Sequence, residues 1–135
     1  MTGKLSCSGN IYSLYSQFKK GLPEYAFYYL FKNCASLQNA PTLSATHLSE
    51  ACYRNMFYGC TSITAAPALP ATTLTSYCYH SMFYGCTSLV TPPSLPATTM
   101  ESSCYYSMFQ GCTSLATSPS LAATTLASSC YYSMF

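Results

Sequence analysis

The chain has 135 residues, of which five are Lys or Arg and three are Glu, so only 6% of its residues are charged, against about 25% in a typical soluble domain. Half of the residues are hydrophobic and 16% are aromatic, which is enough apolar material for one packed domain and argues against disorder. All five basic residues lie within positions 4–54, and residues 55–135 carry a single charged side chain, Glu101. This pattern argues against a nucleic-acid interface built on phosphate neutralisation. No apolar run reaches the length of a membrane-spanning helix.

The first 29 residues precede the repetitive part of the chain, and we assign 1–29 as an N-terminal capping segment. Residues 1–18 lack the apolar stretch of a secretion signal. We therefore expect either that the protein stays in the cytoplasm or that a leader has been removed.

A period of 26 residues governs the rest of the chain. Units begin at Leu30, Met56, Met82 and Met108, and Met134 opens another, so we assign 30–135 to an array of four units and the start of a fifth. One unit cannot bury its apolar face alone, and stability therefore comes from stacking like residues on like residues. A ladder of stacked rings is expected from Phe31, Phe57, Phe83 and Phe109. Because the chain stops two residues into a unit, we expect the native array to continue and the open C-terminal end to favour end-to-end self-association.

The residue pattern predicts one short helix and one short strand in each unit. Cys78, Tyr79, Met82, Phe83 and Cys86 stand at offsets 0, 1, 4, 5 and 8, which mark one face of an α-helix. A helix is therefore expected over 76–85, with a serine able to cap its start and a glycine suited to its end. A short extended stretch broken by proline follows at 87–93. The predicted fold class is an α/β repeat, a leucine-rich-repeat solenoid with one short strand and one short helix per 26-residue unit.

The same residues resemble a known family. The run Gly-Cys-Thr-Ser-Leu followed by Leu-Pro, and then a segment ending in aromatic-x-Gly-Cys, is similar to the BspA-like leucine-rich repeats of bacterial surface proteins. The resemblance covers 30–135. It implies an adhesion function at the cell surface or in the extracellular space.

Nine cysteines could indicate chemistry, and all except Cys7 are spaced alternately by 18 and 8 residues, from Cys34 to Cys130. One interpretation is two ladders of buried thiols that act as small hydrophobic groups. Another is a set of disulfides within or between units. There is no Cys-x-x-Cys pair, and neither histidine falls in a repeated column, so we expect no metal and no cofactor.

Two columns of each unit point away from the predicted inner face. One comprises Arg54, His80, Tyr106 and Tyr132, and the other comprises Lys32, Tyr58, Tyr84 and Gln110. Exposed tyrosines on a rigid array suit contact with a protein or glycan. The candidate binding residues are therefore Tyr58, Tyr84, Tyr106, Tyr132 and His80. The opposing interpretation is an outer surface that varies because nothing contacts it.

The absence of Asp, the scarcity of His and the lack of a repeated base argue that the chain is not an enzyme. The favoured hypothesis is an adhesion or binding module that presents its repeat surface to host matrix protein, glycan or other cells. The alternative is a structural spacer that carries another domain, since near-identical units offer no distinct site. Periodicity by itself implies the scaffold and leaves the function to the site.

Overall fold

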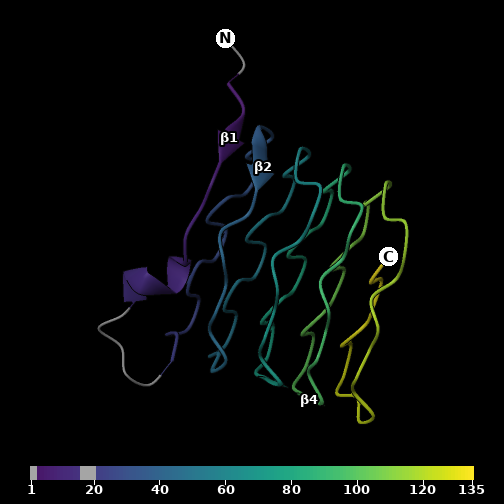
Figure 1. The fold of residues 1–135 in the computed structure, drawn as a ribbon. Coiled ribbons are helices and arrows are strands. Elements are labelled where there is room, and N and C mark those ends of the chain that lie inside the picture. The colour runs from purple at the N-terminus through teal and green to yellow at the C-terminus, as the bar shows by residue number, and fades with distance from the viewer. Residues whose placement is uncertain (1–2, 16–20) are drawn as a thin grey trace.

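The computed structural model describes residues 3–15 and 21–135; residues 1–2 and 16–20 of the predicted capping segment lie outside the described residues. The chain forms successive rungs, one for each 26-residue repeat, which lie side by side from the N-terminus to the C-terminus (Figure 1). Each rung has a strand side, which carries short parallel pairings, and a turn side, which carries the aromatic and cysteine columns. The turn side comprises residues 24–34, 50–60, 76–86, 102–112 and 128–135.

The strand side is held by short parallel pairings between neighbouring rungs. Its strands are β1 (Leu5–Ser6) with β2 (Leu37–Asn39), and β3 (Thr73–Leu74) with β4 (Thr99–Met100). Isolated parallel bridges join Asn10 to Thr42, Ala65 to Thr91, and Leu95 to Leu121. The brevity of the strands agrees with the prolines of each unit, which cannot donate to a strand ladder. One 3₁₀ helix, η1 (Ile11–Tyr15), follows β1.

The turn side is not helical, so the short helix predicted over 76–85 is wrong: these residues form a continuous run of turns. The backbone N–H groups of Met82 and Tyr84 donate to the carbonyl three residues earlier. Those of Ser81 and Phe83 instead donate to carbonyls of the next rung, at 2.8 and 3.0 Å. An α-helix would satisfy all of these groups within its own segment. Bonding between rungs therefore excludes the helix.

This alternation requires left-handed backbone at residues other than glycine. Tyr77 and Ser81 have φ values of 61° and 51°, a conformation that costs about 1–2 kcal/mol for an L-residue. The hydrogen bonds to the next rung offset that cost. Gly85, expected to end a helix, ends the run of turns at a φ of 69°. Gly111 has a φ of 78° and ends the next run of turns in the same way.

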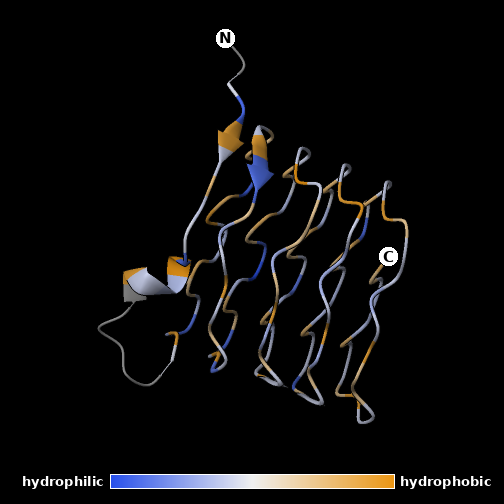
Figure 2. Cartoon of the chain, viewed as in Figure 1, coloured by the Kyte–Doolittle hydropathy of each residue, from blue (hydrophilic) through white to orange (hydrophobic). Residues whose placement is uncertain are grey.

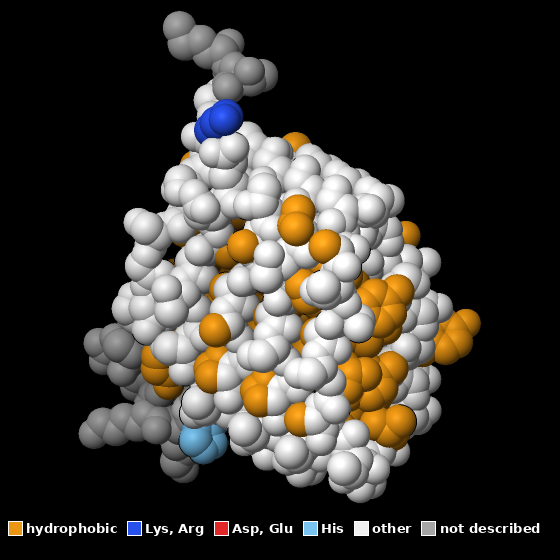
Figure 3. Space-filling view, turned by 45° about the vertical axis from the view of Figure 1, so that its right-hand side comes forward, with side chains coloured by type: hydrophobic (Ala, Val, Ile, Leu, Met, Phe, Trp, Pro, Cys, Tyr) orange, Lys and Arg blue, Asp and Glu red, His pale blue; other side chains and the backbone are white. Residues whose placement is uncertain are grey.

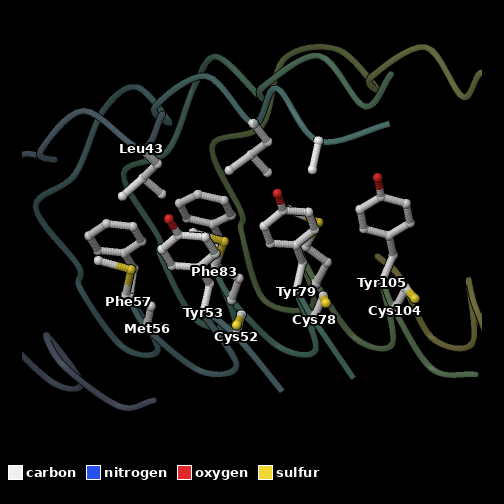
Figure 4. Close-up of a cluster of buried hydrophobic side chains, with 14 of the residues drawn as sticks. Leu43, Cys52, Tyr53, Met56, Phe57, Cys78, Tyr79, Phe83, Cys104 and Tyr105 are labelled. Atoms are coloured by element: carbon white, nitrogen blue, oxygen red, sulfur yellow. The ribbon is translucent and has the colours of Figure 1, made fainter. Parts of the chain in front are cut away.

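The core lies between the two sides of the rungs, and hydrophobic segments recur at corresponding places in successive rungs (Figure 2). The predicted phenylalanine ladder is confirmed: from Phe31 to Phe109 the rings are stacked, with centroids 5.5–5.8 Å apart and planes within 2–7°. Beside it runs a second ladder of Phe27, Tyr53, Tyr79, Tyr105 and Tyr131, with centroids 5.5–6.0 Å apart. Its labelled tyrosines point their hydroxyl groups toward the opposite wall, where Leu43 lies (Figure 4).

The burial predicted for the central unit is therefore confirmed, although the helix is not. Cys78, Tyr79, Met82, Phe83 and Cys86 are all at most 1% exposed. The first rung begins before the predicted array, because the Tyr25 N–H already donates to the Glu50 carbonyl of the next rung at 2.9 Å. Residues 25–29 of the predicted capping segment thus share the turn pattern of the repeats.

Candidate functional site

The outer surface of the turn side carries two rows of polar and aromatic side chains, one residue from each rung. The first outer row consists of Lys32, Tyr58, Tyr84 and Gln110. The second outer row consists of Tyr28, Arg54, His80, Tyr106 and Tyr132. All five candidate binding residues lie in these rows: Tyr132 is 59% exposed and the other four are half-buried. The two rows thus bring together side chains that are 26 residues apart in sequence.

The rings within each outer row are stacked face to face. Tyr58 and Tyr84 have centroids 4.6 Å apart and planes within 2°. His80 stacks on Tyr106 at 4.7 Å, and Tyr106 stacks on Tyr132 at 5.0 Å. These separations are shorter than those of the core ladders and close to the spacing of neighbouring strands, about 4.7–4.9 Å. Tyr58 and Tyr84 in the first row, and His80, Tyr106 and Tyr132 in the second, therefore form aromatic strips along the stack.

His80 is held neutral within its row. Burial and, second, the positive charge of Arg54 lower the pKa of its imidazole to about 4. Its Nδ1 atom shares a hydrogen bond of 3.0 Å with the Ser81 hydroxyl. At neutral pH this ring therefore adds aromatic area to the second outer row without adding charge.

At the N-terminal end of the rows, two cations lie against tyrosine rings. The Lys32 Nζ atom lies 4.2 Å from the ring centroid of Tyr29 and 5.5 Å from that of Tyr58. The guanidinium carbon of Arg54 lies 5.8 Å from the ring centroid of Tyr28 and 5.2 Å from that of Tyr77. These six residues form what we call the cation–tyrosine cluster.

Sequence reasoning placed Lys32 and Arg54 in the outer columns but did not select them as binding residues. It also missed Tyr28, Tyr29 and Tyr77. The available signal was the period itself: Tyr28 stands one repeat before Arg54, in the column that His80 and Tyr106 continue. The ring centroids of Tyr28 and Tyr29 lie 4.1 Å apart. This contact depends on the turn conformation and has no signal in the sequence.

The buried cysteines are poorly suited to act as nucleophiles. All nine are free thiols, as in the first of the two interpretations. Seven of them donate from Sγ to a backbone carbonyl 29 residues earlier, in the preceding rung, as Cys60 does to Phe31 at 2.9 Å. Burial raises the pKa of the Cys52 and Cys60 thiols to about 12. A protonated buried thiol is a poor nucleophile and a poor metal ligand.

Within residues 3–15 and 21–135, no three His, Cys, Asp or Glu side chains are grouped so as to hold a metal ion. None of the helical structure in these ranges is long and apolar enough to cross a bilayer. An open pocket of about 400 Å³ lies at the C-terminal end of the stack, where Phe109, Cys112, Leu115 and Phe135 contribute to its lining.

Comparisons with family models, with curated proteins and with solved structures find no match to this chain. The resemblance of its repeats to BspA-like leucine-rich repeats therefore stays a prediction.

Proposed function

We propose that this chain is a non-enzymatic binding module of a cell surface or the extracellular space, and that its two outer rows contact a protein or glycan ligand. The observation that carries the proposal is the stacking of Tyr58 on Tyr84 and of His80, Tyr106 and Tyr132 on one another, at 4.6–5.0 Å. The leucine-rich-repeat solenoid expected from the sequence is the scaffold that we propose for these rows.

Stacked rings favour binding because little conformational freedom is left to lose. Each tyrosine of an outer row is already held by its neighbour, so a ligand orders few additional side chains when it binds. Tyrosine also combines an apolar ring with a hydroxyl that can donate and accept hydrogen bonds. A row of such rings offers a ligand continuous contact area across several rungs.

The proposal is tested with the double variant Tyr84→Ser/Tyr106→Ser, which interrupts both rows. Binding to a panel of immobilised matrix proteins and cell-surface glycans is measured by surface plasmon resonance. We expect saturable binding that the double variant weakens about tenfold or more, as for tyrosine residues at the centre of an interface. Val90→Ser is the matched control, because Val90 is 45% exposed and lies outside the turn side. Full binding by a folded double variant would refute the assignment of the rows.

The spacer remains the alternative function, and the similar geometry of successive rungs supports it. Deleting one unit, residues 82–107, from the full protein separates the two. A spacer tolerates the deletion, whereas a ligand that contacts several rungs loses affinity.

Self-association of the 135-residue chain is a second candidate, supported by where apolar side chains are exposed. Phe135, Leu126 and Leu121 are 61%, 60% and 46% exposed near the C-terminal end, and Tyr25 and Leu30 are 52% and 46% exposed in the first rung. The face turned toward the viewer in Figure 3 includes this C-terminal side, where hydrophobic side chains gather.

The backbone gives this association a direction. Among the described residues, the N–H groups of Ser129, Ser133 and Phe135 have no acceptor, and the carbonyls of Tyr28 and Leu30 have no donor. Two C-terminal ends would place donors against donors, so the copies must meet head to tail. Sedimentation velocity between 1 and 100 µM tests this: a monomer at every concentration would refute it.

A further inference from the structure

The geometry points to an anionic polysaccharide as the ligand of the outer rows, with an acidic group of the sugar bound at the cation–tyrosine cluster of Tyr28, Tyr29, Lys32, Arg54, Tyr58 and Tyr77. This inference rests on the proposed binding function and specifies the chemistry of its ligand.

The first step of the argument is that the two cations have no protein anion to neutralise them. No carboxylate oxygen lies within 4.0 Å of Lys32 or Arg54 among the described residues. The Arg54 Nε atom is buried and has no hydrogen-bond partner in the described chain. Of the three acids, Glu101 is occupied elsewhere, because its carboxylate accepts hydrogen bonds from the backbone N–H and hydroxyl of Ser76, both at 3.0 Å. The cluster thus keeps two positive charges available to a ligand.

The second step is that the rings around the cations are accessible. Tyr28 and Tyr29 are each 37% exposed, Lys32 is exposed and Arg54 is half-buried. The pKa of Tyr28 reflects how close these groups lie: its hydrogen bond with Tyr29 raises the value, while the charges of Arg54 and Lys32 lower it. Both cations therefore act on one tyrosine, and one anionic group placed there is attracted by both.

The third step concerns the shape of the ligand. The outer rows advance by 4.6–5.0 Å per ring, similar to the advance per sugar in an extended polysaccharide. Because the rings of each row are stacked face to face, a sugar chain along the stack would meet ring edges and tyrosine hydroxyls, which can form hydrogen bonds with the hydroxyls of the sugar. Sulfate and carboxylate groups both suit a pair of cations, and Arg can bind either with two parallel hydrogen bonds. A sugar chain along the stack would therefore meet rings at each rung and the cations at one end.

The experiment compares three hexasaccharides and one hexapeptide by isothermal titration calorimetry. A heparin hexasaccharide carries sulfate, a hyaluronan hexasaccharide carries only carboxylate, chitohexaose is neutral, and hexaglutamate is an acidic peptide. We expect at least one anionic sugar to bind about tenfold or more tightly than chitohexaose. The heparin and hyaluronan arms distinguish sulfate from carboxylate as the preferred group.

The variants are chosen from residues that the repeat itself already accommodates. Lys32→Gln introduces the residue type that Gln110 has in the same column, and Arg54→Tyr introduces the residue type of Tyr106. Folding should therefore be preserved, and Arg54→Tyr should extend the rings of the second outer row. Each variant should weaken anionic-sugar binding about tenfold without weakening the binding of chitohexaose. Lys4→Gln is the matched control, because it removes one charge from an exposed lysine outside the turn side. Its affinity should stay within about twofold of the wild type.

Three results would overturn the inference. Equal binding of anionic and neutral sugars would show that charge plays no role. Equal losses of anionic-sugar affinity in Lys4→Gln and Arg54→Tyr would show that only the net charge of the protein matters. Binding of hexaglutamate alone would indicate an acidic protein as the ligand. In each of these cases the proposed function survives if the panel binding is still lost in Tyr84→Ser/Tyr106→Ser. If no ligand in either experiment binds the folded chain, both the inference and the proposed function fail.

Discussion

Tyr79 carries a hydroxyl group into the core, and replacing this residue with phenylalanine should stabilise the protein. Tyr79 is 1% exposed, and its hydroxyl oxygen has no hydrogen-bond partner among the described residues; the same holds for Tyr53 and Tyr105. A buried polar group left unsatisfied costs about 1–3 kcal/mol. The ladder itself shows that phenylalanine fits, because Phe27 occupies the equivalent position in the first rung and stacks on Tyr53 at 5.5 Å with planes within 12°.

The Tyr79→Phe substitution keeps the ring and removes only the hydroxyl. We therefore expect the free energy of unfolding to rise by about 1 kcal/mol, the lower end of that range. The gain is moderated because the denatured state keeps some residual structure in which the hydroxyl is also partly shielded from water. Urea unfolding followed by circular dichroism measures it: the midpoint should increase while the slope m stays constant. Tyr84→Phe is the control, because Tyr84 lies in an outer row, and its change should stay within about 0.5 kcal/mol.

A loss of about 1 kcal/mol or more in Tyr79→Phe would refute this reasoning, because the hydroxyl would then be making a favourable hydrogen bond in the folded protein. The triple variant that also replaces Tyr53 and Tyr105 extends the test. Its effect is not expected to be a simple sum, since the rings lie 5.9–6.0 Å apart and share their packing.

Three further predictions concern the core and the titrating groups. Phe83→Ala removes a fully buried ring from the middle of the phenylalanine ladder and should lower the free energy of unfolding by about 3–5 kcal/mol, measured in the same urea assay; a loss below 1 kcal/mol would mean that the ladder contributes little. Buried thiols should make the protein sensitive to alkali. Burial raises the pKa of Cys52 and Cys60 from 9.0 to about 12, so their contribution is fully present below pH 9 and is lost as the pH rises toward 12, by up to about 1.4 kcal/mol per pH unit for each thiol. Cys52→Ala should flatten that slope, and an unchanged slope would contradict the assignment. His80 acts at the other end of the pH range: because its pKa is lowered from 6.5 to about 4, its contribution is present above pH 6.5 and is lost as the pH falls toward 4. A proton NMR titration that places the His80 pKa near 6.5 would contradict this, and His80→Gln should reduce the loss of stability in acid.

Much of the candidate site was predictable from the sequence, because a fixed period forces like residues onto one another. The outward position of Tyr58, Tyr84 and His80 follows from their places in the 26-residue unit, and so does the stacking of Phe83 on its neighbours. The pairing of Tyr28 with Tyr29 was not predictable. It depends on left-handed backbone at Tyr29, which has a φ of 57° and no residue type that signals it.

The sequence by itself determined which side chains are buried, and the tertiary structure decided the backbone that buries them. Offsets of 0, 1, 4, 5 and 8 fit a helix of 3.6 residues per turn, but over nine residues they fit equally well a run of turns that repeats every four residues. Local sequence cannot separate these two periods over so short a segment. The choice is made by the neighbouring rungs: each offers a row of carbonyls to alternate N–H groups, such as that of Phe83, which reaches Met108 at 3.0 Å. A helix would turn those N–H groups back into its own segment and leave the facing carbonyls unpaired.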